Sequence, residues 1–480
     1  MVEARHKRRP DFNERYYIAR STEGFYSNFN IVAKYNKHVP RTLLSLALRN
    51  LVRQNSWFTH NFYKDAGSDS AASNGHNWTL QIVDQIHFHD VVTYRQIDQF
   101  NGSTLEEINK LGFGMNVPNV PLWRIIVFEE KISGEQLICA YFDHSQFDGL
   151  SGVQFQKDLA RELALASQTA AKDQFEAVIF NYERDLKYLP KVVIPASESV
   201  TDLYTPPLTT VINHHLGAYL PFYKRVYDWV YTPSTAKEFV NPNPVRKDLS
   251  TKYKIFKFDA SLMAQVTQFC RAHKLTVSSY LDVIVIKALQ DSVFKAVYGT
   301  DEFTSNSYVA INGRRYYSQE IQNFRYGTMV CGDSIYLAPV RDSLQAMKKF
   351  SKQLCDHIGT QNSFKITGML QYQNAWQFLY NKLGKVGARA ALTLSNLGKV
   401  KDSNDIFQFK EMYFGANAGV MYNFVTNVTS LPSNEMTVVF GYLPEFEAYT
   451  IDGANAVDKF AELLERYFKD GVVMDAKFNS

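Results

Sequence analysis

The stretch that decides the fold is Phe142-Asp143-His144-Ser145-Gln146-Phe147-Asp148-Gly149, in which a histidine is followed four residues later by an aspartate–glycine pair. The apolar run 136–142 (QLICAYF) comes directly before it and predicts a buried strand. After it, apolar residues at helical spacing predict a helix over about 151–166. The sequence therefore predicts a strand, a tight turn and a helix, with the histidine leaving the end of the strand.

His144 has the chemistry of a general base, because a neutral imidazole can take a proton from a hydroxyl or an amine near neutral pH. The spacing between His144 and Asp148 is by itself weak evidence for a catalytic pair, since a chain of this composition contains about one such pair by chance. Gly149 permits the tight turn. Two interpretations remain open for Asp148. It either caps the next helix beside a structural histidine, or it anchors a catalytic loop by pairing with an arginine from elsewhere.

The composition excludes several classes of protein. The chain has 480 residues, a net charge of +4 and 45% apolar residues, which is typical of a globular protein of two domains. No basic stripe follows the first ten residues, so we expect no nucleic-acid partner. The four cysteines form no CxxC pair and no run of about 18 apolar residues occurs, so we expect no zinc site and no transmembrane helix.

Periodic segments occur in both halves of the chain. We expect helices over 41–54, 259–272, 276–294 and 454–468, and extended segments over 80–93, 123–129, 308–311, 391–394, 423–429 and 436–442. The stretch 189–244 holds eight of the fifteen prolines and looks like a crossover between domains. The predicted organisation is two α/β sandwich-like domains, 1–190 and 251–480, joined by the crossover 191–250.

Two other groups of residues invite a chemical interpretation. His87 and His89 would lie on one face of a strand and resemble half of a metal site, but no third ligand is near in sequence. Cys331 lies in an apolar stretch without an adjacent base, which is typical of a core residue. We therefore expect no metal and no cysteine nucleophile.

Five short motifs, in order, carry a resemblance to a known family. The first is 142–149; the others are Ile311-Asn312-Gly313-Arg314-Arg315, Phe324-Arg325-Tyr326-Gly327-Thr328, Leu394-Ser395-Asn396-Leu397-Gly398 and Tyr413-Phe414-Gly415. Together they resemble the fungal alcohol acetyltransferase family, a branch of the HxxxDG acetyl-CoA-dependent acyltransferases that includes chloramphenicol acetyltransferase, plant BAHD enzymes and condensation domains. Asp143 stands where many relatives have a second histidine. Tyr413 stands where BAHD enzymes have an aspartate, which disfavours a plant-type identity.

The resemblance implies a fold and a set of roles. The fold is two chloramphenicol-acetyltransferase-like α/β sandwich domains with a central tunnel at their interface, which acetyl-CoA and the acceptor enter from opposite faces. His144 is then the general base, and Asp148 and Gly149 complete its motif. Arg314 is the expected salt-bridge partner of Asp148, with Arg315 as the alternative.

The same resemblance suggests residues for the other steps. Ser395 or Asn396 would donate to the tetrahedral oxyanion, with Tyr413 as a third candidate. Lys399, Lys401 and Tyr413 are candidates for contact with coenzyme A. A thioester is already activated, so the reaction needs no metal.

The predicted function is transfer of acetyl from acetyl-CoA to the hydroxyl of a hydrophobic alcohol, directly in a ternary complex. One alternative is N-acetylation of a long-chain sphingoid-like amine, and another is a non-catalytic protein that binds acyl ligands. The aromatic segment 216–232 is either a membrane-surface element or packing across the crossover. We expect a cytoplasmic monomer, with contact to the endoplasmic reticulum or lipid droplets as an alternative.

Overall fold

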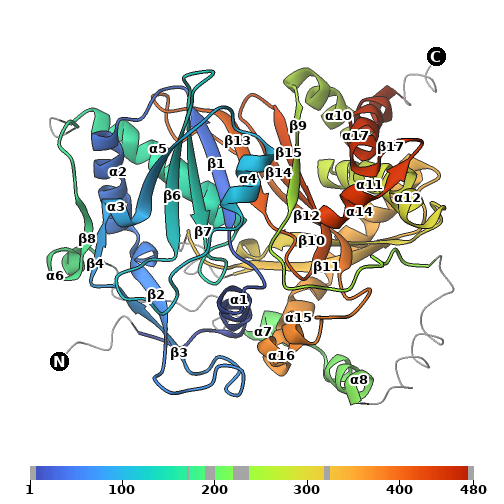
Figure 1. The fold of residues 1–480 in the computed structure, drawn as a ribbon, viewed down its shortest axis with the longest axis horizontal. Helices are drawn as coiled ribbons and strands as arrows, with labels where there is room; N and C mark the ends of the chain where they lie inside the picture. The colour runs from blue at the N-terminus through green and yellow to red at the C-terminus, as the bar shows by residue number, and fades with distance from the viewer. Residues whose placement is uncertain (1–6, 170–171, 190–200, 220–236, 318–324, 474–480) are drawn as a thin grey trace.

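Two α/β halves lie side by side in the computed structural model, which describes residues 7–169, 172–189, 201–219, 237–317 and 325–473 (Figure 1). One half is built on a five-stranded sheet and the other on a six-stranded sheet. Three small two-stranded sheets lie outside them. The predicted α/β fold class with two lobes is confirmed.

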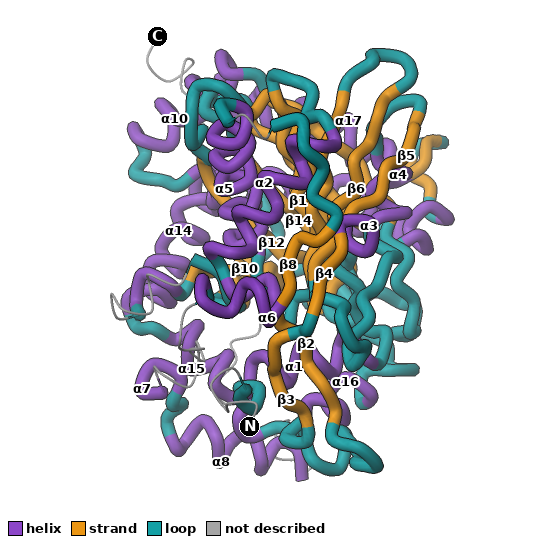
Figure 2. Tube along the Cα trace, turned by 90° about the vertical axis from the view of Figure 1, so that its left-hand side faces the viewer, coloured by secondary structure: helices purple, strands orange, loops and turns teal. Residues whose placement is uncertain are grey.

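The five-stranded sheet has the order β13-β1-β7-β6-β5. Its strands are β1 (Phe29–Tyr35), β5 (Val92–Ile97), β6 (Trp123–Glu130), β7 (Gln136–Phe142) and β13 (Phe409–Ala416). Helices α2 (Arg41–Gln54) and α5 (Gly149–Ser167) cover one face, where alternate apolar residues of β1 and β7 form the core (Figure 2). The opposite face packs against α4 (Gly102–Ile108) and residues of the other half.

Strand β13 comes from the C-terminal part of the chain but pairs antiparallel with β1 along its whole length. Residues of the predicted range 251–480 thus complete the sheet of the first half. The sequence did not predict this exchange, because strand pairing across the chain leaves no local signal. The two halves are consequently held together by main-chain hydrogen bonds as well as by side-chain packing.

The six-stranded sheet has the order β11-β10-β12-β14-β15-β9. Its strands are β9 (Lys252–Phe258), β10 (Ser305–Asn312), β11 (Val330–Leu337), β12 (Ala390–Lys399), β14 (Tyr422–Ser430) and β15 (Met436–Tyr442). One face is covered by α10 (Ala260–Ala272), α11 (Val277–Leu289), α14 (Ser343–Gly359) and α17 (Ala456–Val473). The shorter elements are β2 (His60–Lys64), β3 (Trp78–Ile82), β4 (Gln85–His87), α3 (Phe88–Val91), β8 (Val178–Asn181), α6 (Tyr182–Asp185), α7 (Thr201–Tyr204), α8 (Leu208–Tyr219), α12 (Lys295–Tyr298), α15 (Asn362–Gly368), α16 (Ala375–Tyr380), β16 (Thr450–Ile451) and β17 (Ala454–Asn455).

The six-stranded sheet is open between β10 and β12. The two strands pair in parallel only where Ser307–Val309 lies beside Leu392–Leu394. Beyond Leu394 they separate, and β12 stays paired with β14 alone. Beyond Leu394 the main chain of β12 therefore has a neighbouring strand on one side only.

Helix α1 (Phe12–Thr22) lies below the seam between the two halves (Figure 1). It begins with a capping box in which Asp11 accepts from the Glu14 backbone N–H and Glu14 accepts from that of Asp11. Tyr204 of the crossover is buried beneath α1, with its ring 5.2 Å from Phe12. Most of the aromatic segment 216–232 lies outside the described residues.

Most predicted elements match observed ones, including β7, α2, and the helices capped by Asp259 and Thr276. The prediction of an extended segment over 80–93 is wrong in part. It contains β3, β4 and the start of β5, but residues 88–91 form the single helical turn α3. That turn carries the chain from the small sheet of β4 to the main sheet, so His87 and His89 do not share a strand face.

One pH-dependent property of the fold follows from Asp282, whose carboxylate is fully buried on α11 without a well-formed hydrogen bond. Burial raises its pKa to about 7, although Ser307 nearby opposes the rise. An unfolded aspartate titrates near pH ~4, so folding takes up a proton between pH ~4 and ~7, and the free energy of unfolding falls as pH rises through that window.

We predict that Asp282→Asn is more stable than the wild type at pH 8 by up to about 3–4 kcal/mol, and that the difference vanishes near pH 4. Urea unfolding at pH 4.5, 6 and 8 measures it. The exposed Asp405→Asn is the matched control. An equal difference between wild type and Asp282→Asn at all three pH values would contradict the assignment.

Candidate active site

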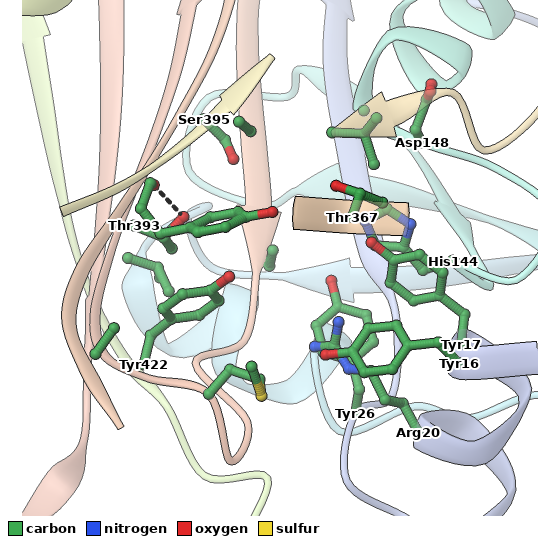
Figure 3. Close-up of a pocket in the computed structure, with 18 of the residues that line it drawn as sticks. Tyr16, Tyr17, Arg20, Tyr26, His144, Asp148, Thr367, Thr393, Ser395 and Tyr422 are labelled. Carbon is green, nitrogen blue, oxygen red and sulfur yellow. Dashed lines mark hydrogen bonds between the residues drawn. The ribbon is translucent and has the colours of Figure 1, made fainter. Parts of the chain in front are cut away.

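A cavity of about 730 Å³ lies between the two halves and takes its walls from both. It brings together six of the predicted site residues: His144, Asp148, Gly149, Arg314, Ser395 and Asn396. Figure 3 shows His144 with residues of α1 on one side of the opening and Ser395 with Thr393 and Tyr422 on the other. Residues from the two predicted domains therefore share one site.

The backbone of His144 is fixed from two directions. Directly before it, the Asp143 carboxylate accepts from the Ser145 backbone N–H at 2.8 Å and from the Ser145 hydroxyl at 2.6 Å. From the other half of the molecule, the Thr328 hydroxyl donates to the His144 carbonyl at 2.9 Å. The loop is thereby held in one conformation, as a base that must meet its substrate requires.

The imidazole of His144 is partly buried among aromatic rings. Tyr17 stacks on it with ring centroids 4.1 Å apart and planes 7° from parallel, and Phe29 and Tyr26 lie at 5.1 and 5.9 Å. Its Nδ1 is buried without a well-formed hydrogen bond, so Nε2 is the nitrogen available to the cavity. Burial, and then the charge of Arg20, lower the pKa of His144 to about 4. The ring is therefore neutral at pH 7 and able to accept a proton.

Asp148 performs both of the roles that the sequence left open. It is the N-cap of α5, where its carboxylate accepts from the Ser151 backbone N–H at 2.9 Å. It also forms a two-pronged ion pair with Arg314, at 2.7 and 3.0 Å, and accepts from the Met329 backbone N–H at 2.9 Å. Burial would raise its pKa, but Arg314 holds the pKa below its ordinary value. Arg315 is exposed, so Arg314 is the partner.

The segment around Tyr326 and Gly327 completes this anchor. The Gly327 carbonyl accepts from Arg314 at 3.1 Å and from the Ser151 hydroxyl at 2.9 Å. The Tyr326 hydroxyl donates to Asp158 of α5 at 2.6 Å. Gly327 has a φ of +146°, which favours glycine at this position. The second and third sequence motifs therefore meet the first in space.

The opposite wall is the free part of β12. Both polar atoms of the Asn396 side chain are already hydrogen-bonded. Its Nδ2 donates to the Ser278 hydroxyl at 3.0 Å, and its Oδ1 accepts from the Gly398 N–H at 2.9 Å. The Thr393 hydroxyl donates to the Tyr308 carbonyl at 2.9 Å. Among the described residues the Ser395 hydroxyl makes no hydrogen bond, and it lines the cavity. The two predicted oxyanion donors thus differ in availability.

Three predicted residues do not line the cavity. Tyr413 lies on the other face of β13 from Phe414, where its ring packs 4.8 Å from Phe100 and its hydroxyl donates to Glu411. Alternate residues of a strand point to opposite faces, so the neighbouring Phe414 reaches the cavity and Tyr413 does not. Lys399 Nζ donates a hydrogen bond to Asn434 Oδ1 at 2.6 Å. The side chain of Lys401 is exposed.

Four cavity residues on α1 were missed from the sequence: Asn13, Tyr16, Tyr17 and Arg20. They stand at i, i+3, i+4 and i+7 of the helix, so they share one face. The capping pair Asp11 and Glu14 and this spacing are a signal that could have revealed the helix. The signal did not stand out because the shared face is aromatic and charged, whereas helix recognition relies on an apolar stripe.

The other groups considered from the sequence show no catalytic arrangement. Among the described residues no cluster of three or more His, Cys, Asp or Glu side chains is arranged to hold a metal ion. Cys331 is buried in β11, and burial raises the pKa of its thiol to about 12. No helix within the described ranges is both long and apolar enough to cross a membrane.

Comparison with solved structures identifies the class of fold. Trichothecene 15-O-acetyltransferase from Fusarium sporotrichioides aligns with a TM-score of 0.65 at 12% identity, covering 96% of this chain and 94% of that one. The condensation domain of the Monacolin K polyketide synthase aligns with a TM-score of 0.59 at 12% identity, over 96% and 97% of the two chains. Both likenesses concern the fold, which is the two-lobed fold of acyltransferases and condensation domains.

The particular family follows from the sequence comparisons. The alcohol acetyltransferase family model matches residues 12–468, and the chain belongs to this family of acyltransferases. Alcohol O-acetyltransferase 2 of Saccharomyces cerevisiae is 23% identical over 96% of this chain and 97% of its own length. Alcohol O-acetyltransferase 1 of the same yeast is 25% identical over 46% of each chain. The predicted resemblance is confirmed.

We predict that Asp148→Asn lowers the free energy of unfolding by about 3–5 kcal/mol, because it removes the buried charge that pairs with the half-buried Arg314 guanidinium. Arg314→Met should destabilise the protein similarly, for the converse reason. Urea unfolding at pH 7 measures both, and the exposed Arg315→Met is the matched control. If Asp148→Asn kept wild-type stability while losing activity, Asp148 would act in the chemistry instead of anchoring the loop.

Proposed function

We propose that the protein transfers acetyl from acetyl-CoA to the hydroxyl of a hydrophobic alcohol, with both substrates bound together in the cavity. The observation that carries the proposal is the neutral His144, fixed at the seam of the two halves with Nε2 open to a cavity large enough for both reacting groups. Membership in the alcohol acetyltransferase family and the names of its yeast relatives support the substrate class.

The reaction is a direct acyl transfer. His144 Nε2 accepts the hydroxyl proton while the hydroxyl oxygen attacks the acetyl carbonyl carbon of the thioester. The tetrahedral adduct collapses, the C–S bond breaks, and the imidazolium returns the proton to the departing thiolate. The products are an acetate ester and coenzyme A, so proton and electron pairs balance without any further reactant.

Ser395 is the donor that we assign to the oxyanion of the tetrahedral adduct. Its hydroxyl is not hydrogen-bonded to any described residue and lines the wall opposite His144, whereas Asn396 already has two partners. A donor held ready for a developing charge stabilises the transition state more than the ground state. Lys399 and Lys401 remain proposed contacts for the coenzyme A phosphates, which would extend beyond the cavity.

The charges of the cavity favour an alcohol over a long-chain amine. Its described lining carries four basic side chains and two acidic ones: Arg20, Arg314, Lys382 and Arg389 against Asp148 and Glu238. A long-chain amine is an ammonium ion at pH 7, and such a lining repels it. An alcohol carries no charge and enters without this penalty.

The proposed function is tested by incubating the purified protein with acetyl-CoA and either 1-octanol or a sphingoid amine. Release of free thiol reports turnover, and mass spectrometry identifies octyl acetate or the N-acetyl amide. We expect thiol release and ester with the alcohol. Amide as the main product would favour the N-acetyltransferase alternative. If no thiol were released with either acceptor, both the O-acetyltransferase and the N-acetyltransferase function would be rejected.

His144→Ala should lower kcat by about 10²–10⁴-fold, because it removes the general base. The melting temperature should change little, since the His144 ring makes no well-formed hydrogen bond through Nδ1. His89→Ala is the matched control, because that side chain is 72% exposed and does not line the cavity. Turnover by His144→Ala near the wild-type rate would end the assignment of the base.

Ser395→Ala should lower kcat by about 10²–10³-fold, the usual effect of removing one oxyanion donor. KM for the alcohol should stay within a factor of about two, since the hydroxyl acts on the transition state and not on the bound alcohol. Steady-state kinetics of Ser395→Ala and Asn396→Ala, side by side, measure the difference. A larger loss for Asn396→Ala would transfer the role to its amide.

A further inference from the structure

Arg20 is a buried cation in the wall of the cavity. It lies on the last turn of α1, its residue is 6% exposed, and it is among the residues that line the cavity. Figure 3 shows it with Tyr16, Tyr17 and Tyr26 on the same side of the opening as His144. In the mechanism proposed above Arg20 affects only the pKa of His144 and contacts neither substrate.

The guanidinium has no anionic partner among the described residues. No described carboxylate forms an ion pair with it, and its Nε is buried without a hydrogen bond. Burial raises the pKa of the Asp143 carboxyl and the charge of Arg20 lowers it, but this group is engaged by the Ser145 N–H and hydroxyl. Asp143 faces a second hollow that Arg20 does not line. The terminal nitrogens of Arg20 are therefore left to the cavity.

Three tyrosine rings surround this cation. The Cζ atom of Arg20 lies 4.2 Å from the ring centroid of Tyr26, 5.3 Å from that of Tyr17 and 5.4 Å from that of Tyr16. Their faces attract a cation but provide no strong acceptor for its N–H groups. An isolated buried charge is costly unless an ion or hydrogen-bond acceptor meets it. The cage thus holds a cation in place and leaves its donors for a ligand.

We propose that Arg20 binds a carboxylate of the acceptor, so that the preferred acceptor is a hydroxy acid with an apolar chain between its two ends. This inference rests on the proposed function and narrows its substrate class. A carboxylate matches the two parallel N–H donors of a guanidinium, and such charge-assisted pairs are the strongest hydrogen bonds available in a protein. A neutral alcohol would leave the charge of Arg20 without an anionic partner.

The rest of the cavity fits such an acceptor. Apolar side chains line it between its polar groups, among them Phe29, Leu150, Leu370, Phe378 and Met421. A chain that lies along these residues would have its carboxylate at Arg20 and its hydroxyl near His144. The volume of about 730 Å³ is within the range of ordinary small-molecule sites.

Binding without turnover provides the first test, so that it does not depend on the proposed reaction. Calorimetry measures the affinity of octanoate and of 1-octanol for the wild type, Arg20→Met, Arg20→Lys and the control Arg315→Met. We expect the wild type and Arg315→Met to bind octanoate at least tenfold more tightly than Arg20→Met does, with Arg20→Lys between them. The affinity for 1-octanol should change less than twofold.

Turnover provides the second test. The ratio of kcat/KM for 8-hydroxyoctanoate to that for 1-octanol should fall at least tenfold in Arg20→Met. A ratio is used because Arg20 also affects the pKa of His144, and this effect is common to both acceptors. A merely structural role for Arg20 would change both rate constants and leave the ratio unchanged.

Three results of the binding experiments would overturn the inference: equal binding of octanoate by wild type and Arg20→Met, displacement of octanoate by acetyl-CoA, or a wild type that binds 1-octanol as tightly as octanoate. The last comparison needs no variant, so the inference stays testable if Arg20→Met fails to fold. Acetylation of 1-octanol with no preference for the hydroxy acid would reject this inference and leave the proposed function standing. Binding of octanoate at Arg20 with no acetyl transfer would reject the proposed function and leave the carboxylate site at Arg20 standing.

Discussion

The ion pair between Asp148 and Arg314 is the interaction on which the site depends. It joins the loop after β7 to the turn after β10, and so ties the two halves together beside His144, the proposed base. The same carboxylate caps α5 and accepts from the Met329 N–H, so its acceptor positions are filled. Removing one partner would leave the other charge without a counter-ion inside the protein, which is costly. The pair therefore stabilises the fold, even though it lies close to His144.

A second constraint is the way the two sheets share strands. Strand β13 completes the first sheet, while β10 and β12 separate after a short stretch of pairing. The exchange holds the halves together, and the separation leaves Ser395 without a neighbouring strand on one side. The β12 wall of the cavity is therefore a consequence of strand pairing. A side chain on a strand is held more precisely than one on a free loop.

The electrostatics of the cavity follow from burial. Aromatic packing around His144 removes water and, with the charge of Arg20, keeps the imidazole neutral. Arg20 is itself desolvated by three tyrosine rings that satisfy none of its N–H groups. Helix α1 supplies these tyrosines together with Arg20, apart from Tyr26 just beyond it. This one short helix thus affects both the protonation state of His144, the proposed base, and the charge in the wall of the cavity.

The sequence by itself determined the strand–turn–helix around His144 and the starts of several helices, because these depend on local periodicity and caps. The pairing of Asp148 with Arg314 was expected from the resemblance of the short motifs to a known family. Only the tertiary structure decided that the Ser395 hydroxyl is free while the Asn396 side chain is hydrogen-bonded, that Tyr413 faces away from the cavity, and that Arg20 lines the same cavity as His144. Those outcomes depend on which strands pair, on which face of a strand a residue lies, and on a helix that docks across the seam. Such contacts join residues far apart in the chain, and no local pattern records them.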